Sequence, residues 1–135
     1  DLARFEEAAS KMNGGRKGAV CVASWRNAGK GQRKAMEWAE ENGGLDIYGG
    51  GYLAPPGSRE IAYEGMPALM ARYRTFVFLP SVIEPFGRTV VEAWAAGCEV
   101  VTNGLVGARY WIEEKPEGLE NPAGDFWGVV MEATA

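Results

Sequence analysis

Residues 79–103 read LPSVIEPFGRTVVEAWAAGCEVVTN and carry the clearest structural pattern of this chain. The apolar residues 75–79 predict a buried strand that ends at Pro80, and residues 99–102 predict a second strand. Between them, residues 88–96 are good or acceptable helix formers, and Gly97 suits the left-handed position that follows many helices. A strand, a helix and another strand in this order predict one βαβ unit with parallel strands.

The same alternation runs through the rest of the chain. It predicts a three-layer α/β/α domain with a parallel sheet of about five to six strands. Further strands are expected at 19–23, 45–48 and 61–63. Helices are expected at 2–12, 29–42, 67–73 and 107–114, with a last helix from Asn121 through Met131.

Two carboxylates flank the start of the helix at 88–96. Pro85 biases Glu84 towards an extended loop conformation, and Gly87 allows a tight turn. Glu92 lies in the second helical turn, and its side chain leans back towards the helix start. A helix N-terminus suits a phosphate group and carboxylates accept hydrogen bonds from hydroxyls, so this layout predicts a phosphorylated sugar as ligand.

The predicted loops share one edge of the sheet. Ligands of open parallel sheets bind beyond the carboxyl ends of the strands. The loops that follow strands there are 24–30, 49–52, 63–65, 81–87 and 103–107.

The string PS-x-x-EPFG-x-x-x-x-EA-x-A-x-G-x-x-VV-x-N resembles the retaining glycosyltransferases of the GT-B fold, of the group 1/family 4 type. The resemblance extends to Val22–Arg26 with Lys30 and Gly31, and to Ile47–Gly51, and it covers roughly residues 18 to 130. It implies a Rossmann-like domain that forms the C-terminal, donor-binding half of a GT-B enzyme. Residues 1–135 would be this domain, excised or truncated, with the N-terminal acceptor-binding domain absent.

The resemblance also implies roles for individual residues. Glu84 would contact hydroxyls of the donor sugar, and Glu92 those of the ribose. Arg26 and Lys30 would neutralise the diphosphate, and a nucleobase would meet the segment near Tyr63. The other donor-binding positions are the backbone amides of Phe86, Gly87, Arg88 and Thr89, and Ser24 and Gly49 on the same rim.

The sequence departs from the commoner family pattern at two positions. Arg88 stands where an aliphatic residue is frequent, and Glu99 where a proline is frequent. The first would alter the sugar pocket. The substrate would be a nucleoside-diphosphate sugar of unspecified base and sugar, and neither a cofactor nor a metal ion is expected.

Each of these residues also has a plainer interpretation. Glu92 could form a solvated salt bridge with Arg88 one turn earlier. Glu84 could be an ordinary loop acid, and Arg26 and Lys30 ordinary surface cations. The run of glycines at 49–51 favours a turn over a phosphate cradle, because it lacks the G-x-G-x-x-G spacing.

Composition narrows the functional classes. The net charge is −4 and no basic stripe is visible, which argues against nucleic acid as a partner. No apolar run reaches the length of a transmembrane segment. The chain has no histidine, so catalytic triads that need one, and zinc sites that need one, are not expected. Cys21 and Cys98 fall in predicted strands, which favours buried reduced thiols and a cytoplasmic location.

Other functions stay open at this level. A nucleotide-sugar epimerase or a sugar phosphorylase shares the GT-B scaffold. The chain could also be a binding module without turnover. Without an acceptor-binding half, the isolated chain is expected to bind a nucleotide but to transfer sugar poorly.

Overall fold

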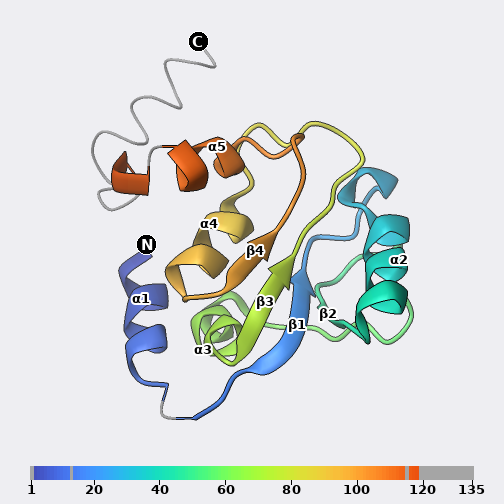
Figure 1. The fold of residues 1–135 in the computed structure, drawn as a ribbon. Coiled ribbons are helices and arrows are strands. Elements are labelled where there is room, and N and C mark those ends of the chain that lie inside the picture. Colours follow the sequence, from blue (N-terminus) through green and yellow to red (C-terminus); the bar gives the residue numbers. More distant parts are fainter. Residues whose placement is uncertain (1, 13, 115, 119–135) are drawn as a thin grey trace.

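The computed structural model describes residues 2–12, 14–114 and 116–118 (Figure 1). The helix expected from Asn121 to Met131 lies outside these residues. The α-helices are α1 (Leu2–Ser10), α2 (Gln32–Asn42), α3 (Met66–Ala71), α4 (Arg88–Ala95) and α5 (Ala108–Glu114). The strands are β1 (Lys17–Val22), β2 (Asp46–Tyr48), β3 (Tyr73–Val77) and β4 (Glu99–Val101), and three short 3₁₀-helices are η1 (Ala28–Lys30), η2 (Tyr63–Gly65) and η3 (Pro116–Gly118).

The strands form one parallel sheet in the order β2-β1-β3-β4. The predicted α/β fold with a Rossmann-like parallel sheet is confirmed. The sheet has four strands within the described residues, fewer than the expected five to six. β3 also begins two residues earlier than expected, because Tyr73 pairs with Lys17 at the start of β1.

The strand expected at residues 61–63 is wrong. Only Arg59 joins the sheet edge, as an isolated bridge to Tyr48. Ala62 is extended, with φ −74° and ψ 147°, but η2 begins directly after it. β2 is the edge strand of the sheet but is only three residues long. Because the chain enters η2 at Tyr63, residues 61–63 form no ladder with it.

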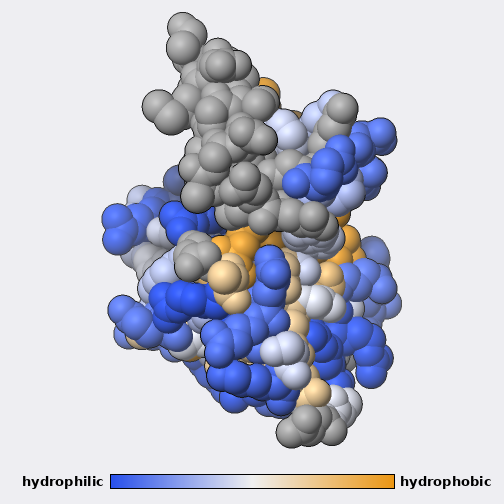
Figure 2. All heavy atoms as spheres, turned by 90° about the vertical axis from the view of Figure 1, so that its left-hand side faces the viewer, coloured by the Kyte–Doolittle hydropathy of each residue, from blue (hydrophilic) through white to orange (hydrophobic). Residues whose placement is uncertain are grey.

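Helices cover both sides of the sheet. Figure 1 shows α2 on one side and α1, α3 and α4 on the other. The apolar core on the latter side includes Phe5, Val20, Phe76 and Val90, each fully buried. Figure 2 views the side of α1, where mostly hydrophilic side chains surround a band of apolar ones. None of the described helices combines the length and the hydrophobicity that crossing a membrane requires.

The helix expected at 29–42 is divided in two by Gly31. This glycine has a left-handed backbone, with φ 85°, between η1 and α2. The helix after the EPFG string runs from Arg88 to Ala95, within one residue of the expected range. Gly97 is left-handed, with φ 87°, as its place after a helix predicted.

Candidate functional site

The strand order creates a topological switch point between β1 and β3. The chain leaves β1 towards β2 on one side, and it enters β3 on the other side after crossing the sheet. The loops that follow β1 and β3 therefore diverge at this point, which is where open α/β sheets bind ligands. In Figure 1 the carboxyl ends of the strands point to the upper part of the molecule, where these loops lie.

Lys30 and Glu84 meet across this switch point. Lys30 Nζ donates to Glu84 Oε1 at 2.5 Å, and the two side chains are 25% and 19% exposed. They come from different loops, because Lys30 ends η1 after β1 and Glu84 follows β3. The structure thus brings together two residues that the sequence analysis assigned to the diphosphate and the sugar.

The backbone around this ion pair is held in place. The Asn27 side chain accepts from the Gly29 amide at the start of η1, at 2.9 Å. Gly29 in turn accepts from the Ser81 amide at 2.9 Å, which ties η1 to the loop after β3. A Cβ on Gly31 would lie 2.1 Å from the carbonyl oxygen of Leu79, so only glycine fits this approach of the two loops.

Glu84 itself is fixed through its main chain. Its amide donates to Leu105 O at 2.8 Å, and its carbonyl accepts from the Gly107 amide at 3.0 Å. Gly107 lies so close to Pro85 that a Cβ would be 2.0 Å from the Pro85 oxygen. The loop that carries Glu84 is therefore clamped against the loop after β4.

Glu92 is the one buried charged residue among those described, with 2% of its surface exposed. Tyr63 Oη donates to Glu92 Oε2 at 2.9 Å, and Arg88 Nη2 donates to Tyr63 Oη at 3.2 Å. Arg88 Nε lies 3.6 Å from Glu92 Oε2, so the predicted pair one turn apart is present. The pair is not the solvated bridge of the plainer interpretation, because the carboxylate is buried and has a second partner, Tyr63.

These contacts act in opposite directions on the Glu92 carboxyl. Burial raises its pKa above the ordinary value, while the Tyr63 hydrogen bond and the Arg88 charge lower it. Burial and the neighbouring Glu92 raise the pKa of the Tyr63 phenol. The Glu92 carboxylate is thus largely shielded from water, and further hydroxyl donors would stabilise its charged form.

A hollow of about 500 Å³ opens beside these residues, and we call it the carboxyl-end hollow. Five residues of the predicted site line it: Ser24, Arg26, Gly49, Tyr63 and Thr89. Its other lining residues are Val22, Ala23, Gly50, Gly51, Glu60, Ile61 and Met66. Six predicted site residues are not part of this lining: Lys30, Glu84, Phe86, Gly87, Arg88 and Glu92. Glu92 is connected to the lining through its hydrogen bond from Tyr63.

Two features of the hollow correct or extend the sequence analysis. Gly49 and Gly51 are needed because a Cβ would lie 1.8 Å from Ala23 O and 2.3 Å from Trp25 O, respectively. Their role is the close packing of two loops, in agreement with the expected turn. Glu60 was missed as a lining residue, and no sequence signal marks it, because it lies in an irregular segment.

The start of α4 faces the same edge of the sheet. Gly87 precedes the helix with φ 84°, and Thr89 lines the carboxyl-end hollow. Helix geometry leaves the amides of Arg88 and Thr89 without an intrahelical acceptor. Phe86 is fixed by its carbonyl, which accepts from the Ala108 amide at 2.6 Å.

A larger hollow, about 590 Å³, lies at the opposite ends of the strands and is called the amino-end hollow here. Lys17, Trp38, Tyr73 and Arg74 are among its lining residues. None of the predicted site residues lines it, and it is at the end of the sheet where parallel folds do not bind their ligands. The carboxyl-end hollow is therefore the candidate site despite its smaller volume.

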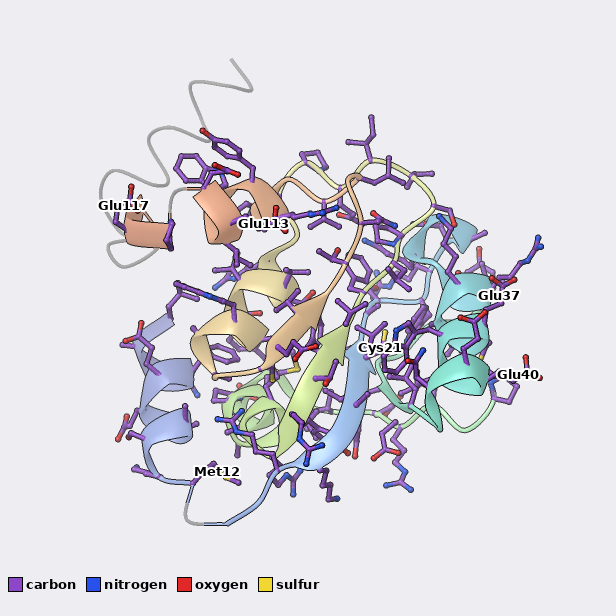
Figure 3. The ribbon with its side chains drawn as sticks, in the orientation of Figure 1. Met12, Cys21, Glu37, Glu40, Glu113 and Glu117 are labelled. Atoms are coloured by element: carbon purple, nitrogen blue, oxygen red, sulfur yellow. The ribbon has the colours of Figure 1, made fainter. Side chains whose placement is uncertain are left out.

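The cysteines are separate from this site. Cys21 and Cys98 are buried free thiols, as predicted, and burial raises their pKa to about 12 and about 11. Figure 3 marks Cys21 within the sheet. No group of three or more metal-ligating side chains is found in the described part of the chain.

Comparisons with known proteins support the fold. No protein-family model matches the chain. An uncharacterized glycosyltransferase of Methanocaldococcus jannaschii is 40% identical over 57 residues, which are 39% of this chain and 15% of that protein. The crystal structure of Anabaena HepE in complex with UDP-glucose has a TM-score of 0.56 and 18% identity, over 96% of this chain and 45% of that chain. The second likeness shows the fold, and the chain spans less than half of either protein.

Proposed function

We propose that this chain is the donor-binding domain of a retaining glycosyltransferase of the GT-B, group 1/family 4 type. It would bind a nucleoside-diphosphate sugar for transfer to an acceptor held by an N-terminal domain. Two comparisons support the general assignment to a glycosyltransferase that uses a nucleotide sugar, since the archaeal relative is named a glycosyltransferase and HepE binds UDP-glucose. The observation that carries the proposal is Glu92, a buried carboxylate that accepts a hydrogen bond from Tyr63, and Tyr63 lines the carboxyl-end hollow.

The ribose is assigned to Glu92. Burying an ionised carboxylate is unfavourable unless it is paired and hydrogen-bonded. Tyr63 and Arg88 already contact one of its oxygens, Oε2. A ribose has two adjacent hydroxyls that can donate to a carboxylate, so it would complete the hydrogen bonding of a group that the fold keeps away from water. The nucleobase would then lie near Tyr63.

The diphosphate is assigned to the cations and to the start of α4. Arg26 lines the hollow and Lys30 lies at the switch point. The amides of Arg88 and Thr89 add the positive end of a helix dipole. Such donors stabilise the negative charge that develops on a leaving diphosphate, without a cofactor or metal ion. Glu84 would accept hydrogen bonds from hydroxyls of the donor sugar.

Titration calorimetry of the purified chain tests this proposal. The ligands are UDP, GDP and ADP and their glucose conjugates, and the variant is Glu92→Gln. One hydrogen bond to a charged group contributes about 1.5–3 kcal/mol, so the variant should bind the preferred ligand at least about tenfold more weakly. Wild-type affinity in Glu92→Gln would contradict the ribose assignment.

The matched control is Glu37→Gln. It makes the same change of charge in an exposed pair with Arg33 on the outer face of α2, where Glu37 points away from the sheet (Figure 3). The control should bind like the wild type. Circular dichroism of each ligand-free variant verifies that it has folded.

A further inference from the structure

We infer that the Lys30–Glu84 ion pair makes the site select nucleoside-diphosphate sugars against free nucleoside diphosphates. The inference rests on the proposed function and names the residues that set this preference. It follows from the fact that the two groups assigned to phosphate and sugar are each other's partners in the ligand-free protein.

Among the ion pairs of the described residues, Lys30–Glu84 is the one in which both side chains are largely sheltered from solvent. In the Arg33–Glu37 pair the side chains are 91% and 56% exposed, so water replaces a lost partner at little cost. In the Lys30–Glu84 pair the exposed fractions are 25% and 19%. A carboxylate this sheltered depends on a partner, and removing that partner is unfavourable.

The two residues also have little freedom to separate. η1 is tied to Ser81 through Gly29, and Glu84 is clamped by Leu105 and Gly107. Gly31 is in contact with the backbone of Leu79. Because backbone hydrogen bonds hold the two loops together, the loops do not move the pair apart, and a ligand must compete with each side chain for the other.

A free diphosphate satisfies only one member of the pair. Its oxygens would take Lys30 from Glu84 and would place further negative charge near a carboxylate that has lost its cation. A diphosphate with a sugar attached supplies hydroxyls as well. These hydroxyls donate to Glu84 while the phosphates accept from Lys30, so both members of the pair exchange one partner for another.

This exchange predicts a preference that depends on Glu84. The wild type should bind the glucose conjugate of its preferred nucleotide at least about tenfold more tightly than the free nucleotide, the factor for one charge-assisted hydrogen bond. In Glu84→Gln, Lys30 is released and the repulsion is removed. The free nucleotide should then bind more tightly than to wild type, and the preference should fall towards one.

Calorimetry with inorganic pyrophosphate measures the binding of phosphate groups to Lys30 without the contributions of the sugar and the nucleoside. Glu84→Gln should bind pyrophosphate several-fold more tightly than wild type. Glu37→Gln makes the same charge change at an exposed pair and should show little change. Equal pyrophosphate affinities in the two variants, with an unchanged preference for the conjugate in Glu84→Gln, would overturn the inference.

A second comparison uses the wild type alone and so does not depend on the variant folding. The P-methyl ester of the preferred nucleoside diphosphate has the same charge as the glucose conjugate but offers no sugar hydroxyls. It should bind at least about tenfold more weakly than the conjugate, and equal affinity would overturn the inference. If the wild type binds no nucleotide or conjugate, the proposed function fails too. If binding depends on Glu92 but not on Glu84, only the present inference fails.

Discussion

Gly31 and Gly43 offer a matched test of the close loop packing that forms the site. They flank α2 with almost the same backbone angle, φ 85° and φ 88°. A Cβ on Gly43 would meet nothing within 4 Å, whereas a Cβ on Gly31 would lie 2.1 Å from Leu79 O. Alanine at either position therefore introduces the same backbone strain, but only at Gly31 does it force the loops after β1 and β3 apart.

The expected losses of stability follow from two contributions, the backbone strain of a left-handed alanine and the steric contact with Leu79 O. A left-handed alanine costs about 1–2 kcal/mol, partly offset by about 0.4–1 kcal/mol from the stiffer unfolded chain, so Gly43→Ala should lose about 1 kcal/mol. Forcing extra volume into a packed contact adds about 1–3 kcal/mol. Gly31→Ala should therefore lose about 3 kcal/mol in total.

Urea unfolding and thermal melting of both variants measure this difference. For a domain of this size, about 2 kcal/mol between them corresponds to a difference of about 8 °C in Tm. Gly31→Ala should also weaken nucleotide binding, because it moves Lys30 relative to Glu84. Equal loss of stability in the two variants, with equal ligand affinity, would refute the close approach of the two loops.

Three further predictions concern the buried groups. Burial raises the Glu92 pKa above its ordinary value of 4.5, so the contribution of this group to stability is present below that pH and is lost as pH rises through the folded-state pKa. Glu92→Gln should therefore be more stable than wild type at pH 7. This advantage should shrink in unfolding curves recorded below pH 4.5. A double-mutant cycle of Tyr63→Phe and Glu92→Ala should show a coupling of about 0.5–1.5 kcal/mol, and additive losses would contradict the hydrogen bond between them. Cys21 and Cys98 should resist a thiol reagent at pH 8 in the native state and react on unfolding, and rapid native-state labelling would show that they are not buried.

The helix after the EPFG string was predictable from sequence, because local signals define it, whereas β3 begins and ends two residues earlier than expected. Pro85 and Gly87 set the loop and the helix start, and Gly97 sets the helix end. The burial of Cys21 followed from its apolar neighbours in β1, whereas Cys98 is buried just before β4. In each case the signal lies within a few residues of the feature that it determines.

The features that the sequence did not predict depend on contacts between residues that are far apart in the chain. Tyr63 contacts Glu92 across 29 positions, and Lys30 contacts Glu84 across 54. The sequence suggested that these residues share one rim, but no local pattern shows which of them contact one another. The strand expected at 61–63 failed because this segment pairs with the edge strand β2 only at Arg59, and the chain enters η2 at Tyr63.

The most direct test is to map ligand binding by NMR on the ¹⁵N-labelled chain. UDP-glucose, GDP-glucose and ADP-glucose would be titrated in turn, and the amide shifts followed at both hollows. Binding at the proposed site should perturb Ser24, Gly49, Tyr63 and Thr89, which line the carboxyl-end hollow, together with Lys30 and Glu84. Perturbation confined to Lys17, Trp38 and Tyr73 at the amino-end hollow, or no perturbation by any of the three ligands, would contradict the proposed function.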